Sequence, residues 1–164
     1  MHVTLHMAVS IDGFVARTNG QTDWVSAVDL ALFEKRCKEI GCAVMGKTTF
    51  DEVGVMDGVS TIVLTHQPES QENQERVTFV SSPQEALKAA ESKGHATILL
   101  SGGGTTNGAF LKPGLIDEIY LTVHPIVLGE GIRLFGDNKA EMNYTLLDTR
   151  KLSEQLVELH YTKA

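Results

Sequence analysis

The sequence predicts an α/β fold with a central, mostly parallel sheet, helices on both faces and an antiparallel C-terminal edge. Two observations lead to this fold class. Over the first two thirds of the 164 residues, short apolar runs alternate with segments of helical periodicity, as in successive strand–helix units. After Pro113 the chain is almost continuously β-like, which indicates strands that pair without intervening helices.

The expected strands follow from apolar patterning. The segment 2–9 alternates, so Val3, Leu5, Met7 and Val9 should face the core, whereas His2 and His6 should face solvent. A short extended segment is expected at 14–17. The runs at 42–46 and 60–65 are continuously apolar, as in strands buried on both faces. Further strands are expected at 76–80, 96–101, 115–129, 144–152 and 156–162, the last two as an antiparallel pair.

Helices are expected at 26–40, 47–53, 82–93 and 108–112. In the first, Leu30, Phe33, Cys37 and Ile40 recur at helical spacing. The third begins with Ser82 as N-cap and Pro83 as the first helical residue. Three pairs match the capping-box pattern, in which a hydroxyl and an acid three residues apart satisfy the first N–H groups: Ser26 with Asp29, Thr48 with Asp51, and Ser82 with Glu85.

Composition places the chain among soluble globular proteins with a single domain over 1–164. Its net charge of −7 argues against nucleic acid or an anionic membrane as a partner. No apolar run has membrane-spanning length, and the N-terminus lacks the features of a secretory signal. Cys37 and Cys42 suggest no disulfide framework, so a cytoplasmic location is expected.

Asp29 combines two features of the first helix. It is the acidic member of a capping box, and a carboxylate in the first turn also complements the helix dipole. At about 100° per residue it also lies within about 40° of Phe33 and Ile40, on the apolar stripe. A carboxylate on that side must be paired, neutralised or placed in a pocket. Asp29 is therefore predicted either to cap the helix, to border a cleft, or to do both.

Polar residues and glycines follow the ends of four expected parallel strands. Parallel strands end at one edge of a sheet, where α/β proteins bind ligands. Free N–H groups at helix starts, with glycines that allow close approach, suit phosphates. The ends carry Gly46, Lys47, Thr48 and Thr49; Leu64, Thr65 and His66; Ser81; and Gly102, Gly103, Gly104, Thr105 and Thr106. This arrangement predicts a site for a ligand with two separated phosphate groups.

Other chemistries find little support in the sequence. The six histidines are scattered without metal-ligand spacing, so no metal site is expected. The nucleophile elbow G-x-S-x-G of hydrolases is absent.

The chain resembles the dihydrofolate reductase-like superfamily, and within it the reductase domain of the riboflavin-biosynthesis deaminase–reductase and its stand-alone relatives. The matching stretches are SIDGFVA at 10–16, VMGKTTFDEV at 44–53, LLSGGGTTNGAFL at 99–111, LIDEIYLTVHPIVLGEGIRLF at 115–135, and the two closing strands. The resemblance implies a dihydrofolate reductase-like fold, NADPH as cofactor, a small-molecule substrate and a homodimer.

The resemblance also implies roles for particular residues. Ala8 and Val15 would offer backbone groups to the nicotinamide carboxamide. Lys47, Thr48, Thr65 and His66 would surround the 2′-phosphate, and residues 102–106 would cradle the pyrophosphate. The pattern from Trp24 through Asp29 to Phe33 is similar to the substrate-binding segment of dihydrofolate reductases themselves, in which Thr122 would be the neighbour of the acid.

Three functions remain open from the sequence. The first is an NADPH-dependent reductase of the riboflavin-pathway aminopyrimidine, with hydride passing to a C=N or C=O carbon, and with Asp29 and Thr122 as catalytic candidates. Arg17, Lys47 and Arg133 are the cations available for a substrate phosphate, and Glu130 is a second candidate acid. The second is a pterin or folate reductase, and the third is a non-catalytic nucleotide-binding dimer.

Overall fold

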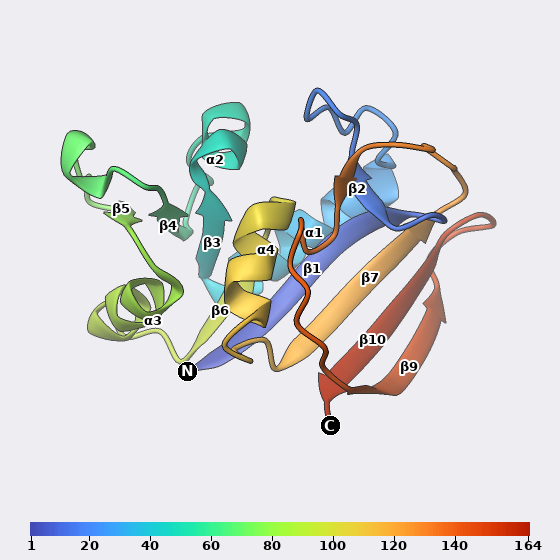
Figure 1. Ribbon diagram of the computed structural model, residues 1–164. Coiled ribbons are helices and arrows are strands. Elements are labelled where there is room, and N and C mark those ends of the chain that lie inside the picture. Colours follow the sequence, from blue (N-terminus) through green and yellow to red (C-terminus); the bar gives the residue numbers. More distant parts are fainter.

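The computed structural model describes residues 1–164 and confirms an α/β fold with a mostly parallel sheet (Figure 1). Eight strands form this sheet in the order β5-β4-β3-β6-β1-β7-β10-β9. The first six are parallel, and β10 and β9 add an antiparallel edge. The bounds are β1 His2–Ser10, β3 Cys42–Gly46, β4 Ser60–Leu64, β5 Val77–Val80, β6 Thr97–Leu100, β7 Glu118–His124, β9 Tyr144–Lys151 and β10 Val157–Lys163.

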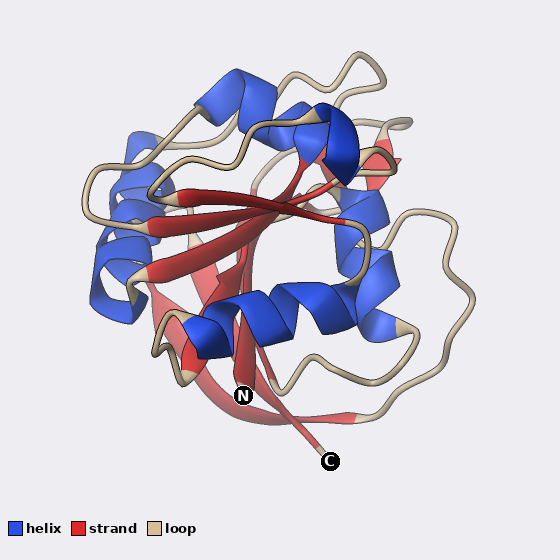
Figure 2. Ribbon diagram, turned by 90° about the vertical axis from the view of Figure 1, so that its left-hand side faces the viewer, coloured by secondary structure: helices blue, strands red, loops and turns tan.

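Helices cover both faces of the sheet (Figure 2). Helix α1 (Ala27–Ile40) packs on one face, while α3 (Pro83–Ser92) and α4 (Gly104–Leu111) pack on the other. Helix α2 (Lys47–Val53) directly follows β3. A short 3₁₀ helix, η1 (Pro68–Ser70), and a two-stranded sheet of β2 (Phe14–Ala16) and β8 (Ile132–Arg133) complete the fold. None of the helices has the length and apolar character that crossing a bilayer would require.

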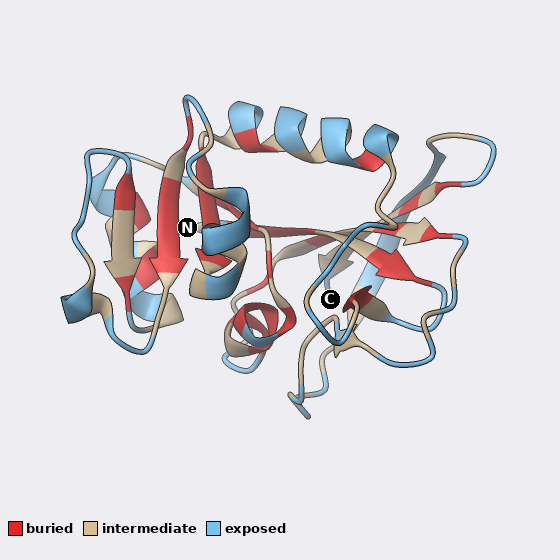
Figure 3. Ribbon diagram, turned by 90° about the horizontal axis from the view of Figure 1, so that it is seen from above, coloured by how far each residue is buried: buried red, intermediate tan, exposed pale blue.

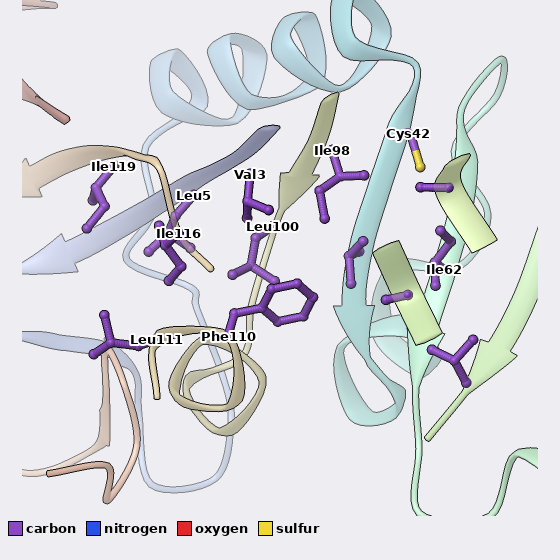
Figure 4. Close-up of a cluster of buried hydrophobic side chains, with 14 residues drawn as sticks. Val3, Leu5, Cys42, Ile62, Ile98, Leu100, Phe110, Leu111, Ile116 and Ile119 are labelled. Carbon is purple, nitrogen blue, oxygen red and sulfur yellow. The ribbon is translucent and has the colours of Figure 1, made fainter. Parts of the chain in front are cut away.

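The sheet separates two hydrophobic clusters. The larger joins Val3, Leu5 and Leu100 of the sheet to Phe110 of α4 (Figure 4). It extends to Ala86 of α3. The smaller joins Cys37 of α1 to Ala43, Met45 and Leu99 on the opposite face. Because both faces are covered, β3 is apolar along its whole length and β6 is apolar after Thr97, as expected for parallel strands.

Helix α1 buries only a narrow stripe. Figure 3 shows the outer surface of this helix as exposed and its buried positions on the side toward the sheet. The buried residues are Asp29 and Cys37. The predicted burial of Asp29 is confirmed, since it is 2% exposed. Leu30 was expected on the same stripe, but it is 51% exposed because it lies one position further round the helix.

Two further expectations about local structure were wrong. Helix α4 begins at Gly104, four residues earlier than expected, because contacts to the 132–136 segment hold the glycine-rich start in helical form. His6 does not face solvent: β1 lies in the middle of the sheet, and α1 covers the face on which His6 stands.

Candidate functional site

A cavity of about 570 Å³ opens at the carboxyl ends of β3, β4, β5 and β6 and reaches β1 and the first turns of α1. It brings together most of the residues that the sequence predicts for cofactor binding. Those on its wall are Ala8, Val15, Gly46, Lys47, Thr48, Thr49, Leu64, Thr65, His66, Ser81, Gly103, Gly104, Thr105 and Thr106. Asp29 lines the same cavity, together with His6, Leu30 and Phe33.

Two helices begin at this cavity without side-chain caps. The N-cap of α2 is Gly46 and that of α4 is Gly103, and neither provides a side-chain acceptor for the first N–H groups. By contrast, Ser26 and Ser82 cap α1 and α3 with their hydroxyls. Strands β3 and β6 are neighbours in the sheet, so the two uncapped N-termini lie close together. Unpaired N–H groups and two positive helix ends favour anionic groups at this point.

Close backbone packing explains two of the glycines. A Cβ on Gly46 would come within 2.5 Å of Thr106 Oγ1, and a Cβ on Gly104 would come within 2.2 Å of the Arg133 carbonyl oxygen. The Gly46 N–H also donates to the Gly102 carbonyl at 2.9 Å, and the Gly102–Gly103 peptide bond is cis. The bare backbone of both helix starts therefore forms part of the cavity wall.

Lys47 is the one lysine or arginine on the cavity wall. Its Nζ donates to both carboxylate oxygens of Asp51, at 2.5 and 2.7 Å. The expected capping box of Thr48 with Asp51 is therefore wrong. Gly46 occupies the N-cap position, and Asp51, one turn along α2, pairs with the lysine. An anion that binds Lys47 would have to compete with this carboxylate or share the cation with it.

Asp29 forms only half of its predicted capping box. Its backbone N–H donates to Ser26 Oγ at 3.2 Å, as the pattern requires. The second bond of the box, from the Ser26 N–H to the Asp29 carboxylate, is missing because the Ser26 N–H donates to His124 Nε2 at 3.1 Å. The Asp29 carboxylate instead accepts from His6 Nε2 through Oδ1, at 3.1 Å. Capping thus occupies the backbone of Asp29 and leaves its side chain to the cavity.

The second carboxylate oxygen of Asp29 has no hydrogen-bond donor from the protein. His124 Nε2 lies 3.9 Å from Oδ2, beyond hydrogen-bond distance. This nitrogen already accepts the Ser26 N–H, while Nδ1 of the same ring faces the Thr122 carbonyl at 3.1 Å and must carry the proton. His124 therefore has no proton to offer Asp29, and Oδ2 is available to a donor in the cavity.

Some of the sequence-predicted residues do not line the cavity. Thr122 is fully buried on β7, beside Ala8 of β1, and its hydroxyl has no hydrogen-bond partner. Gly102 stands behind the wall, against Met7. The remaining charged candidates, which are also absent from the wall, are Arg17, Arg133 and Glu130. The Arg17 guanidinium donates to both carboxylate oxygens of Asp23.

A buried polar network beside Asp29 was not expected from the sequence. Arg36 donates to His6 Nδ1 at 2.7 Å and to Glu158 Oε2 at 2.6 Å. Burial raises the pKa of Glu158, but the hydrogen bond and charge of Arg36, with a smaller contribution from Arg150, outweigh this and hold the pKa below its usual value. Arg36 does lie on the same side of α1 as Asp29 and Phe33, at helical spacing, and this was the one available signal.

The SIDG motif has a structural role in this protein. The Asp12 carboxylate accepts from Ser10 Oγ at 2.7 Å and from the N–H groups of Leu128 and Gly129 at 3.1 and 2.7 Å. The Ser10 hydroxyl, followed by these N–H groups, lowers the pKa of Asp12 although partial burial opposes the shift. Asp12 thereby ties the turn after β1 to the loop after β7.

Comparisons with known proteins agree with this architecture. The chain is 32% identical to the uncharacterized protein YwjB of Bacillus subtilis, over 98% of this chain and 97% of YwjB. It is 30% identical to the riboflavin biosynthesis protein RibD of Mycobacterium tuberculosis over 83% of its own length, which corresponds to 45% of RibD. It superposes on dihydrofolate reductase from Enterococcus faecalis, complexed with NADP(H) and RAB-propyl, with a TM-score of 0.77, 20% identity and coverage of 99% and 96%.

The dihydrofolate reductase superposition, at this identity, shows a shared fold. Family membership follows from the sequence comparison, because residues 48–158 match the RibD C-terminal domain. This match runs from the second residue of α2 to the start of β10, and it includes the uncapped N-terminus of α4. The chain therefore belongs to the RibD C-terminal domain family.

Proposed function

We propose that this protein is an NADPH-dependent reductase that transfers hydride to a small nitrogen heterocycle. One observation carries the proposal: a single cavity is bordered both by two uncapped helix N-termini with a lysine and by a buried carboxylate with a free oxygen. The first set suits a dinucleotide phosphate, and the second suits the N–H groups of a ring.

The residues present fit NADPH. The backbone N–H groups at the starts of α2 and α4 would hold the pyrophosphate, and Lys47 with Thr48, Thr65 and His66 would hold the 2′-phosphate. When bound, NADPH supplies the hydride. The protein would hold both reactants in contact and exclude water, with Ala8 and Val15 orienting the nicotinamide through their backbone groups.

Asp29 would bind the substrate through Oδ2. Asp29 lines the cavity together with Leu30 and Phe33, and its Oδ2, which has no donor from the protein, can accept from a ring N–H or an exocyclic amino group. This interaction would fix the ring orientation and stabilise positive charge on a ring nitrogen during reduction. Thr122, buried behind the wall, would support this region without touching the substrate.

Two substrate classes fit to different degrees. Family membership favours 5-amino-6-(5-phosphoribosylamino)uracil or a related aminopyrimidine. Its phosphate would need a second cation, whereas Lys47 is the single lysine or arginine on the cavity wall and is paired with Asp51. This observation favours a ring without a phosphate, such as a dihydropterin or dihydrofolate, as the second candidate.

Loss of NADPH absorbance tests these proposals directly. The assay compares dihydrofolate with the ribosylaminouracil, the latter both with and without its 5′-phosphate. Faster turnover of the phosphorylated form would support the riboflavin-type substrate, and turnover of dihydrofolate alone would support the pterin reductase. Tight NADPH binding without turnover of any of the three would contradict both, and would favour a non-catalytic nucleotide-binding protein.

The proposal extends to assembly and location. Family resemblance implies a homodimer. The two cysteines favour the cytoplasm, and the net charge of −7 argues against nucleic acid or an anionic membrane as a partner. Sedimentation equilibrium at micromolar protein concentration tests the dimer, and a mass equal to one chain would contradict it.

A further inference from the structure

His6 stands between a carboxylate and a guanidinium in the interior of the protein. It lies in the middle of β1, is 2% exposed, and reaches the cavity wall beside Asp29. Its ring is held edge-on to Phe33 of α1, at 5.5 Å between ring centroids. Both ring nitrogens have partners, so the protonation of His6 follows from what those partners can donate or accept.

Arg36 determines which nitrogen of His6 carries the proton. Arg36 Nη1 lies 2.7 Å from Nδ1, and a guanidinium has only donors and stays charged. Nδ1 must therefore accept and be unprotonated. The ring proton is then on Nε2, which lies 3.1 Å from Asp29 Oδ1 and donates to it. A second proton on Nδ1 would set one N–H against another, so the contact with Arg36 opposes the charged form of His6.

Arg36 is itself fixed in place. The same Nη1 donates to Glu158 Oε2 at 2.6 Å, and the guanidinium lies 3.8 Å over the ring of Tyr120. Glu158 is 4% exposed, and its other oxygen accepts from Arg150 at 2.9 Å. Arg36 thus cannot turn away from His6 without leaving a buried carboxylate short of its main partner.

Charged groups from three elements surround His6. Helix α1 contributes Asp29 and Arg36, β10 contributes Glu158, and β9 contributes Arg150. Strand β7 adds Tyr120, beneath Arg36, and His124, beyond Asp29. Both guanidinium groups pair with Glu158, so the two groups that bind the His6 ring are the Asp29 carboxylate at Nε2 and the Arg36 donor at Nδ1.

We propose that His6 is a positioning residue for Asp29. It remains neutral, as the Nε2–H tautomer that Arg36 selects, and its single N–H turns the carboxylate so that Oδ2 faces the cavity. The assignment of Oδ2 to a substrate rests on the proposed function, whereas the tautomer of His6 does not.

Nitrogen-detected NMR of protein labelled with ¹⁵N-histidine tests the tautomer. The expected spectrum has His6 with Nδ1 unprotonated and Nε2 protonated. A wild-type His6 that carries its proton on Nδ1 would overturn the proposal. This measurement needs neither a variant nor a substrate.

Two arginine variants form a matched pair. Arg36→Met removes the donor to Nδ1 but keeps an apolar side chain, so Nδ1 is free to carry a proton and the His6 signals should depart from those of the pure Nε2–H form. Arg150→Met removes the outer partner of Glu158 and leaves the Arg36–His6 bond in place, so the His6 signals should not move. If the first variant also shows the pure Nε2–H form, Arg36 does not select the tautomer and the proposal fails.

Kinetics separate positioning from simple structural support. With a substrate that the wild type reduces, His6→Leu should raise KM about 10- to 100-fold, because the Asp29 carboxylate loses the N–H that orients it. His6→Gln keeps an N–H near Asp29 and should recover most of the affinity. Equal losses in both variants would contradict positioning. Absence of activity in the wild type would count against the proposed function only, since the NMR result stands independently.

Discussion

Asp29 occupies the third position of α1, where its backbone and side chain have different partners. The backbone N–H completes the Ser26 cap, and the carboxylate faces His6 and the cavity. Capping and ligand binding are therefore compatible at one residue. The helical spacing predicted the burial of Asp29. It could not predict that His6 would bind the Asp29 carboxylate in place of the Ser26 N–H.

The ion pair of Lys47 and Asp51 allows the preference for NADPH over NADH to be tested by changing a single charge. Asp51→Asn should free Lys47 for the 2′-phosphate and tighten NADPH binding about 2- to 5-fold, as expected for a partly exposed ion pair, without changing NADH binding. Lys47→Met should remove the preference for NADPH. Isothermal titration with both nucleotides measures these effects, and equal NADPH and NADH affinities in the wild type would contradict the role of Lys47.

Asp12 should make the folding stability of the protein depend on pH in the acidic range. Because its folded pKa is lowered from 3.8, its stabilising effect is present above that value and is lost as the pH falls through the folded pKa. At pH 7 the Asp12→Asn variant should melt at a lower temperature than the wild type. The difference should shrink below about pH 4, as thermal denaturation followed by circular dichroism would show. A difference that stays constant with pH would mean that the carboxylate charge is not involved.

At the level of elements, the start of α4 depends on the absence of a side chain at Gly104. Gly104→Ala places a Cβ 2.2 Å from the Arg133 carbonyl oxygen and should destabilise the fold by about 1–3 kcal/mol, because both partners are backbone. Thr105→Ala, at the next and exposed position, should change stability by less than about 0.5 kcal/mol. Urea denaturation of both variants gives the comparison, and similar values for the two would contradict the packing argument.

The helices and strands were largely predictable from the sequence, because their apolar periodicity and the residues that begin or end them are local signals. The strands, the Ser82 cap and the antiparallel end all follow from such signals. The early start of α4 was not predictable, since glycines are poor helix formers and a distant segment holds them. Likewise, the cavity wall followed from strand ends, whereas the network of His6, Arg36 and Glu158 depends on the packing of three segments that lie far apart in the chain.

At the scale of the whole molecule, we expect a single folding unit. The sheet is continuous from β5 to β9, and the larger cluster joins residues from Val3 to Ile119. Calorimetric unfolding should give one transition whose calorimetric and van't Hoff enthalpies agree. Two separable transitions would show that the antiparallel edge unfolds independently. At NADPH concentrations about 100 times its Kd, the transition should be stabilised by about 2.7 kcal/mol.

Trp24 is the one tryptophan of the chain, and its place has a practical consequence. Its ring lies edge-on to His124, at 5.2 Å between ring centroids, two residues before the cap of α1, and its buried indole N–H has no partner. All tryptophan fluorescence therefore comes from one point beside the Asp29 region of the cavity. The emission band overlaps the absorbance of a reduced nicotinamide, so energy transfer would report cofactor binding without any label. The protein thus carries its own optical probe of site occupancy.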